Sequence, residues 1–400
     1  MTATTPLDLG SLGRTMDDVV TMAELREKLG SGRPMRIKYG VDVTAPFLHI
    51  GHAVNLWAMR DLQERGHVVV FLVGDFTTRI GDPTGRSETR KVIDRDDIER
   101  NAERFIEQVG RVLLTDPAVF EVRRNSEWWD AMSIDELLGL LAMVTHSRLI
   151  QRDMFQQRIA AGHEIHVHEL LYPILQGYDS YALASDLTIV GTDQLFNELM
   201  GRFFQERLGQ APQVVATTRI TPGTDGREKQ SKSLGNYVAI ADPPREMFGK
   251  LMSIPDGLIR QYLEVYTVVP LDEVAAMAGE MAAGRLNPRD AKRALARAVV
   301  ERYHGAEAAG AEDEWFMSTF SQRRTPDDVE VVTVPAGTTV LDALARCLPG
   351  ETRSALRRLV GEGAVRLGGR KLVDPHEVLV VDGDDVLQVG KRRWFRIRAS

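Results

Sequence analysis

The chain has 400 residues, 43% of them hydrophobic and 27% charged, which is the composition of an ordinary globular protein and excludes a disordered or fibrous one. This length exceeds what one hydrophobic core organises, so we expect two or three domains. The net charge of −7 argues against a nucleic-acid partner for the whole chain, but residues 335–400 carry 12 Lys and Arg against 8 Asp and Glu, a net charge of +4. A basic C-terminal module on a more acidic body favours polyanion binding by that module.

The N-terminal residues and the apolar segments do not predict export or membrane insertion. Residues 1–6 lack the basic region and apolar core of a signal peptide. No uncharged apolar run approaches the roughly 18–20 residues needed to cross a bilayer. The single cysteine, Cys347, has no partner for an internal disulfide, and we interpret it as a small buried side chain. We therefore expect a cytoplasmic protein without membrane contact.

Strand and helix patterns alternate through the first half of the chain. Strands are predicted at 35–41, 67–74, 120–124, 187–190 and 213–216, and helices at 51–64, 96–112, 135–144 and 193–207. Short β-branched apolar runs such as 67–74 are typical of buried parallel strands. The alternation predicts an α/β fold with a Rossmann-like, doubly wound parallel sheet.

After about residue 243 the pattern changes. Helices alone are predicted at 246–252, 256–265, 271–283 and 288–304. A polar, proline-containing segment follows, and the final ~70 residues combine two short helices with short strands and glycine turns. We predict a catalytic domain with a connective insertion over 1–242, a small all-helical domain over 243–321, a linker over 322–333 and an α+β domain over 334–400.

The segment His49-Ile50-Gly51-His52 lies between the first of these strands and the first long helix. Ligands of open α/β sheets bind at the carboxyl ends of strands, where helix N-termini offer free N–H groups. Two histidines at that point can face a phosphate and stabilise the charge of a nucleotidyl-transfer transition state, while Gly51 leaves room for a nucleoside. The alternative is a helix cap and a buried structural histidine, and other nucleotidyl transferases share the motif.

A second motif, Lys229-Gln230-Ser231-Lys232-Ser233, lies in a segment rich in turn residues. Lysines on a mobile loop can close over a pyrophosphate and neutralise its charge as it leaves. Alone, the motif would be interpreted as a solvated surface loop. Because the two motifs occur in one chain, near the two ends of the Rossmann-like pattern, together they predict adenylate-forming chemistry.

With these motifs the chain resembles the class I aminoacyl-tRNA synthetases, in particular bacterial tyrosyl-tRNA synthetases with a KMSKS-type loop and a C-terminal S4 domain. The resemblance covers nearly the whole chain, and further matching stretches are 81–86, 172–180, 191–194, 247–253 and 389–393. It implies a homodimer that joins L-tyrosine to tRNA(Tyr) through tyrosyl-adenylate. ATP with Mg²⁺ is then the co-substrate, and neither a tightly bound cofactor nor a resident metal is expected.

One predicted helix face carries Tyr172, Gln176 and Asp179 at i, i+4 and i+7. A solvated face fits poorly, because apolar residues surround these three. By resemblance, Tyr172 and Gln176 join Asp82 in holding the α-ammonium group of tyrosine, and Asp179 accepts a hydrogen bond from the phenol. The remaining tyrosine contacts that the resemblance implies are Gln194 at the carbonyl, Gly40 and Asp42.

The resemblance also implies the residues that act on ATP. The catalytic residues would be His49, His52, Lys229 and Lys232. The ATP-binding residues would be Thr44, Gly51, Arg86, Arg90, Asp193, Lys229 and Lys232. From the residues alone, Asp193 is either a helix cap or a ribose ligand, and the two arginines are exposed loop charges. The three histidines of 163–168 lack the spacing of a zinc site.

Two basic groups stand out in the C-terminal module. They are Arg353, Arg357 and Arg358 on a predicted helix, and Lys391, Arg392 and Arg393 beside two aromatic residues. Such clusters bind phosphates, and the module resembles an S4 RNA-binding domain, which implies that it holds the tRNA away from the acceptor end.

Five residues depart from the family pattern. Glu228 stands where a further lysine is common, and Val43 where proline is usual. Gln230 replaces the usual Met, for which we expect an altered loop equilibrium with activity retained. Lys38 stands where many tyrosyl enzymes place a tyrosine near the phenol, and Thr78 where Gly is common. These positions leave open a paralogue that activates another aromatic amino acid or serves a non-tRNA acceptor. A non-catalytic RNA-binding protein with the same fold is the alternative from another class, and the intact histidines and lysines argue against it.

Overall fold

The computed structural model describes residues 9–43, 48–82, 94–231, 234–321, 329–381, 385–390 and 393–399. The chain forms two compact units, 1–305 and 306–400. Among the described residues, no helix combines the length and the apolar composition needed to cross a membrane.

The described part of the first unit is built around a six-stranded sheet with the order β1-β6-β5-β2-β3-β4. The strands are β1 (Met16–Val20), β2 (Arg36–Val41), β3 (Val68–Val73), β4 (Phe120–Arg124), β5 (Leu187–Gly191) and β6 (Val214–Thr218). Strands β2 to β6 run parallel, which confirms the predicted Rossmann-like fold. Strand β1 pairs antiparallel with β6 at the edge. It was not predicted, because two adjacent aspartates interrupt its apolar pattern.

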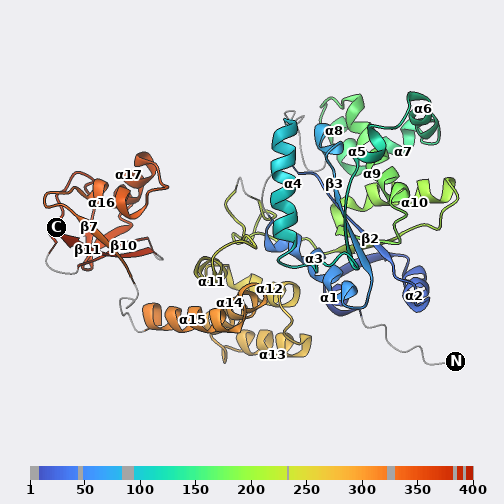
Figure 1. The fold of residues 1–400 in the computed structure, drawn as a ribbon. Helices are drawn as coiled ribbons and strands as arrows, with labels where there is room; N and C mark the ends of the chain where they lie inside the picture. Colours follow the sequence, from blue (N-terminus) through green and yellow to red (C-terminus); the bar gives the residue numbers. More distant parts are fainter. Residues whose placement is uncertain are drawn as a thin grey trace. The chain divides into compact units, whose positions relative to one another are not determined.

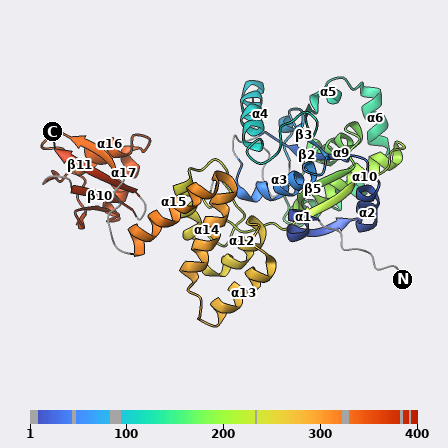
Figure 2. The same cartoon turned by 60° about the horizontal axis from the view of Figure 1, so that its bottom comes forward.

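Helices connect and flank these strands (Figure 1). They are α1 (Gly10–Thr15), α2 (Met22–Gly30), α3 (Ile50–Gln63), α4 (Arg95–Val109), α5 (Ser126–Trp129), α6 (Ile134–Ala142), α7 (His146–Ile150), α8 (Asp153–Ala160), α9 (Val167–Ala182) and α10 (Leu195–Arg207). Helices α9 and α10 lie side by side (Figure 2). Glycines permit this approach, since a Cβ atom would lie 2.8 Å from Met200 Cβ at Gly177 and 2.5 Å from Ser180 Oγ at Gly201.

Residues 244–304 are helical, as predicted for this stretch, and complete the first unit. They form α11 (Pro244–Met252), α12 (Ile259–Tyr266), α13 (Leu271–Ala282) and α14 (Pro288–His304). Helix α12 contacts α1 and α3. The Arg14 guanidinium of α1 fixes this contact by donating to the carbonyl oxygens of Leu263, Glu264 and Val269.

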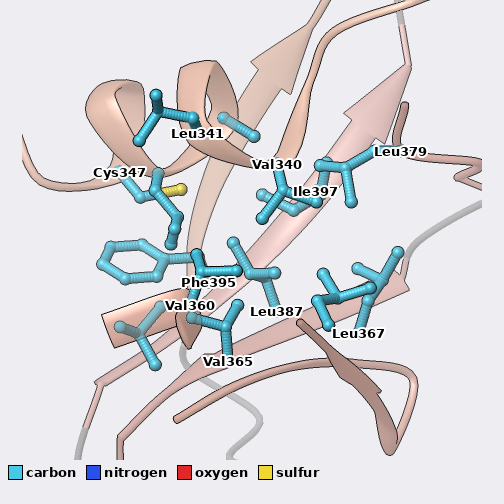
Figure 3. Close-up of a cluster of buried hydrophobic side chains, with 14 of the residues drawn as sticks. Val340, Leu341, Cys347, Val360, Val365, Leu367, Leu379, Leu387, Phe395 and Ile397 are labelled. Carbon is cyan, nitrogen blue, oxygen red and sulfur yellow. The ribbon is translucent and has the colours of Figure 1, made fainter. Parts of the chain in front are cut away.

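The second unit contains α15 (Ala306–Phe316) and a small α+β fold. The latter consists of β7 (Glu330–Val334), α16 (Val340–Cys347), α17 (Arg353–Gly361), β8 (Val365–Leu367), β9 (Arg370–Leu372), β10 (Asp385–Val389) and β11 (Arg393–Ala399). In the described residues these strands form one sheet with the order β7-β11-β10-β8-β9. Apolar side chains of α16 and α17, Cys347 included, pack against the strands to form the core (Figure 3).

Two boundaries differ from those expected. Residues 330–333, expected in the linker, belong to β7, which pairs in parallel with β11 and so lies inside the C-terminal fold. Residues 306–316, expected in the helical domain, belong to the second compact unit. Residues 322–328 of the predicted linker lie outside the described residues. The remaining domain boundaries stay a prediction.

Candidate active site

A cavity of about 370 Å³ opens at the carboxyl ends of the parallel strands. Residues that end or follow β2, β3, β5 and β6 line it, among them Asp42, Gly74, Gly191 and Thr218. This is the edge at which open α/β sheets bind ligands. The cavity brings together the predicted Gly40, Asp42, His49, Gly51, His52, Asp82, Tyr172, Gln176, Asp179, Asp193, Gln194 and Lys229. The predicted Thr44, Arg86, Arg90 and Lys232 lie outside the described residues.

His49 and His52 form a compact pair at the N-terminus of α3. His49 is the N-cap residue, and its backbone N–H donates to Nδ1 of His52 at 3.3 Å. The rings stack with centroids 3.6 Å apart. A Cβ atom at Gly51 would lie 3.0 Å from His49 Cε1 and 3.2 Å from Gln230 Nε2, so glycine alone fits without displacing these side chains.

Both imidazoles are neutral at physiological pH. Burial, with smaller effects from His52 and Lys229, lowers the pKa of His49 to about 2. The His52 side chain is exposed to the cavity, where desolvation by the surrounding residues and Lys229 lower its pKa to about 4. Because Nδ1 of His52 accepts the backbone bond, its proton resides on Nε2. The pair therefore offers neutral N–H donors to a ligand beside the helix N-terminus.

Lys229 and Asp193 lie close to each other in the lining of the cavity. Lys229 Nζ lies 3.9 Å from Asp193 Oδ2, and the lysine side chain is largely exposed. Asp193 lies inside the short 3-10 helix Thr192–Gln194 and is not the N-cap of that helix or of α10. Its carboxylate is consequently available to a polar ligand.

Gln230, which departs from the family pattern, is buried beside Lys229. Its Nε2 atom donates to the Tyr266 hydroxyl at 2.8 Å, and its Oε1 atom accepts from the backbone N–H of Val238 at 3.4 Å. Tyr266 also shares a hydrogen bond with Thr221. The loop is thus attached to α12 through a polar side chain, and the expected change in loop equilibrium stays a prediction.

A hydrogen-bonded network orients the amides in the amino-acid region of the cavity. Asn197 Nδ2 donates to Oε1 of Gln176 at 2.8 Å and to Oε1 of Gln194 at 3.1 Å. Gln194 Nε2 in turn donates to Asp82 Oδ2 at 2.8 Å. The Tyr172 hydroxyl donates to Asp42 Oδ2 at 3.0 Å. Sequence reasoning missed Asn197, which shows no motif and acts only through contacts between α9 and α10.

Asp179 is a buried carboxylate in the cavity wall, with 3% of its surface exposed. Its Oδ1 atom accepts from the indole N–H groups of Trp128 at 2.8 Å and Trp129 at 2.9 Å, and its Oδ2 atom accepts from Asn125 Nδ2 at 3.2 Å. Burial nevertheless raises the pKa of Asp179 to about 7, against the lowering effects of Lys38 and these three donors. The sequence offered no local signal for the donors, because they belong to a different part of the chain and reach Asp179 only in the fold.

The affinity for a phenolic substrate is expected to fall as the pH falls through about 7. Above that pH Asp179 is ionised and offers a charged acceptor to a phenol hydroxyl, the contact that the family resemblance implies, whereas below it the carboxyl is neutral. Because the charged bond is stronger by roughly 1.4 kcal/mol, we expect the KM for tyrosine to rise about tenfold between pH 8 and pH 5.5. Steady-state kinetics over this range test the prediction, with the KM for ATP as the control. A KM for tyrosine that does not vary with pH would contradict it.

Comparison with known proteins gives the class of this site and fold. The family model for class I tRNA synthetases (W and Y) matches residues 30–321, and the chain belongs to this family. The tyrosine–tRNA ligase of Moorella thermoacetica is 45% identical over 376 residues, which are 94% of this chain and 91% of that protein. The tyrosine–tRNA ligase of Thermotoga maritima is 42% identical over 386 residues, 96% of each chain. The resemblance expected from the motifs is thereby confirmed.

Solved structures agree in fold. A C-terminally truncated mitochondrial tyrosyl-tRNA synthetase of Aspergillus nidulans superposes with a TM-score of 0.62 at 22% identity, covering 78% of this chain and 94% of that one. The tyrosyl-tRNA synthetase of Archaeoglobus fulgidus, complexed with L-tyrosine, has a TM-score of 0.58 at 24% identity, covering 76% and 98%. At these identities the likeness concerns the fold alone.

Proposed function

We propose that the chain is a tyrosine–tRNA ligase. It activates L-tyrosine with ATP to tyrosyl-adenylate and pyrophosphate, and then transfers the tyrosyl group to the 3′ end of tRNA(Tyr). The observation that carries the proposal is one cavity lined both by the neutral His49–His52 pair at a helix N-terminus and by the buried carboxylate of Asp179. Two curated relatives, named as tyrosine–tRNA ligases and 42–45% identical over nearly the whole chain, support it.

In the first step, a carboxylate oxygen of tyrosine bonds to the α-phosphorus of ATP, and the bond from that phosphorus to the leaving pyrophosphate breaks. Negative charge grows on the phosphate oxygens. His49 and His52 donate N–H groups to these oxygens, and the resulting hydrogen bonds strengthen in the transition state. Lys229 and Lys232 neutralise the pyrophosphate. No side chain acts as a nucleophile, so the acceleration comes from positioning and charge stabilisation.

In the second step, the terminal ribose hydroxyl of the tRNA attacks the carbonyl carbon of the adenylate, and AMP leaves. The ribose of the adenylate is assigned to Asp193, whose carboxylate lines the cavity. Thr44, Arg86 and Arg90 are proposed as further phosphate contacts, and Gly51 as the point of close approach of the nucleoside. Mg²⁺ is proposed to enter with ATP as part of the substrate.

Tyrosine is proposed to bind with its amino-acid end and its phenol end in contact with different sets of polar residues. The α-ammonium group is assigned to the carboxylate of Asp82, the hydroxyl of Tyr172 and the amide oxygen of Gln176, and the substrate carbonyl to Gln194. Asp42 supports Tyr172 through the hydrogen bond between them, and Gly40 leaves space in the cavity wall. The phenol hydroxyl is assigned to Asp179, the acceptor that phenylalanine cannot satisfy.

The C-terminal unit is proposed to bind tRNA. Arg353, Arg357 and Arg358 are exposed on α17, and Arg393 is exposed at the start of β11. Lys391 and Arg392, which lie outside the described residues, complete the predicted basic group. Such exposed guanidinium groups suit phosphate contacts, whose affinity falls as the salt concentration rises.

We also propose a cytoplasmic homodimer whose interface includes α6. Ile134 and Leu138 of this helix are 76% and 56% exposed. Ile134 lines an apolar cavity of about 160 Å³, together with side chains that include Phe76, Trp129 and Leu171. Exposed apolar surface beside a groove is typical of interfaces, and the same patch on a second copy supplies the complementary side chains of a two-fold interface.

The proposed interface predicts a monomeric double variant. Ile134→Asp/Leu138→Asp places charges in the apolar contact, and we expect its mass in light scattering to fall from about twice the 44.6 kDa of one chain to one chain. Val268→Asp serves as the control, because Val268 is 69% exposed but lies in the helical region. A wild-type protein that is monomeric at micromolar concentration would contradict the homodimer.

Tyrosine-dependent ATP–pyrophosphate exchange tests the proposed activity. Each of the twenty amino acids is supplied separately to the purified chain with Mg²⁺ and ATP. We expect the highest kcat/KM with tyrosine. Faster exchange with another aromatic amino acid would overturn the assignment of the substrate while leaving the adenylation chemistry in place.

A further inference from the structure

A buried ion pair forms part of the cavity wall. Lys38 Nζ of β2 lies 2.8 Å from Glu198 Oε2 of α10, and each side chain is only 2% exposed. Both residues line the cavity. Removing two charges from water is unfavourable, and an apolar pair of similar volume is often as stable or more stable. Stability alone therefore does not explain an ion pair at this position, whereas the hydrogen bond of Glu198 to Gln176 and that of Lys38 to Ser180, the neighbour of Asp179, give it a role in the cavity.

The glutamate of the pair orients an amide of the substrate region. Glu198 Oε1 accepts from Nε2 of Gln176 at 2.8 Å, and Glu198 Oε2 accepts from Nε2 of Gln213 at 2.9 Å. The other end of the Gln176 amide accepts from Asn197 at 2.8 Å. Exchanging the oxygen and nitrogen of the Gln176 amide would place N–H against N–H and oxygen against oxygen, so the network permits one orientation.

The lysine of the pair lies beside the phenol acceptor. Lys38 Nζ donates to Ser180 Oγ at 2.7 Å, and Ser180 follows Asp179 directly on α9. Of the groups that lower the pKa of Asp179 against burial, Lys38 has the largest effect. The ammonium group is therefore held in place by one bond to α9 and one ion pair to α10.

We propose that the Lys38–Glu198 pair is a positioning element with two roles: Glu198 fixes the Gln176 amide, and the ammonium group of Lys38, held near Asp179, sets selectivity for tyrosine over phenylalanine. The two roles concern different parts of the substrate. The contact of Glu198 with Gln176 acts on the part of the substrate that both amino acids share, whereas the charge of Lys38 near Asp179 acts only on a substrate with a hydroxyl group. The inference rests on the proposed function.

The test is the double variant Lys38→Met/Glu198→Gln, assayed by tyrosine-dependent pyrophosphate exchange from pH 5.5 to 9.5. It removes both charges together and keeps an oxygen that accepts from Gln176. Because an opposite charge nearby lowers the pKa of a carboxyl by about 1–3 units, we expect the acid limb of kcat/KM for tyrosine to move upward by at least about one unit. At pH 7.5 this lowers kcat/KM for tyrosine roughly threefold or more, and the loss shrinks toward pH 9.5. The inhibition constant of phenylalanine changes less than about twofold.

A control variant and a second test variant separate selectivity from general damage. Lys250→Met/Asp242→Asn removes another partly buried lysine–carboxylate pair, 2.7 Å apart and outside the cavity lining, and is expected to leave the pH profile unchanged. Lys38→Gln/Glu198→Gln, in which two amides can bond to each other, carries the test if the first variant does not fold. An unmoved acid limb, or equal losses for tyrosine and phenylalanine at every pH, would overturn the inference. If the wild-type protein shows no tyrosine-dependent exchange, it is the proposed function that fails.

Discussion

Replacing His49 with alanine is expected to lower the kcat of tyrosine-dependent pyrophosphate exchange roughly 10²- to 10³-fold, the loss typical when one preorganised donor to a transition-state oxyanion is removed. The affinity for tyrosine is expected to change less than about threefold, since the role proposed for the imidazole is at the phosphate and not at the amino acid. The same pattern is expected for Lys229→Ala. Burst kinetics of adenylate formation and equilibrium binding of tyrosine measure the two quantities separately.

The pKa values of the histidines sharpen this prediction. Because the pKa of His49 is lowered to about 2 and that of His52 to about 4, both donors remain neutral from pH 5.5 to 9. Their contribution to kcat is therefore expected to be independent of pH in this range. His163→Ala, which removes an exposed histidine outside the cavity, is the matched control and should retain full activity. Equal losses of tyrosine binding and adenylate formation in His49→Ala would contradict the transition-state role.

Replacing Asp179 with asparagine is expected to lower kcat/KM for tyrosine about a hundredfold. The charged acceptor becomes a neutral amide whose N–H group faces the donors around it, and a buried hydrogen bond left unmade there costs up to about 3 kcal/mol. Phenylalanine has no hydroxyl group to lose a partner. The ratio of kcat/KM for tyrosine to kcat/KM for phenylalanine should therefore fall by the same factor. The acid limb near pH 7 should also disappear from the profile for tyrosine, because the titrating group is gone.

Asp186→Asn provides the control for removing a buried carboxylate. Asp186 accepts hydrogen bonds from the Arg33 guanidinium and the backbone N–H of Arg36 and does not line the cavity. Hydrogen bonds with Arg33 contribute to the lowered pKa of Asp186. Loss of the Asp186 carboxylate should therefore reduce the free energy of unfolding at pH values above the pKa of this group in the unfolded state, about 4. The kinetic constants for tyrosine should stay unchanged. If Asp179→Asn kept the wild-type selectivity, Asp179 would not be the acceptor of the phenol.

The parts of the fold that depend on local chemistry could be predicted from the sequence. The apolar run of β3 and the helix that starts at Ile50 follow from short-range pattern and capping, and both lie within one or two residues of their predicted positions. The boundary near residue 330 could not be predicted in this way. Strand β7 is largely exposed, and its pairing with β11, at the other end of the C-terminal domain in sequence, decides that it belongs to the C-terminal sheet.

The candidate site, like the fold, could be predicted from the sequence only where local spacing determines it. The face of α9 that carries Tyr172, Gln176 and Asp179 is visible as a helical spacing, and all three line the cavity. Their partners are not visible, because Glu198 and Lys38 reach them only through the packing of α10 and β2 around α9. Lys38 illustrates the limit most clearly. In the sequence, Lys38 occupies a position where many tyrosyl enzymes have a tyrosine. In the fold, it forms a buried ion pair with Glu198.

The most direct test of the central claim is aminoacylation of total bacterial tRNA by the purified chain with ATP, Mg²⁺ and labelled tyrosine. Acid-stable labelled tRNA should form at a rate that unlabelled phenylalanine in hundredfold excess does not reduce. The label should be released by mild base, as expected for an ester at the 3′ end. If pyrophosphate exchange with tyrosine occurs but no tRNA is labelled, the chain activates tyrosine for another acceptor. If another amino acid is attached to tRNA in preference to tyrosine, the assignment of the substrate is wrong.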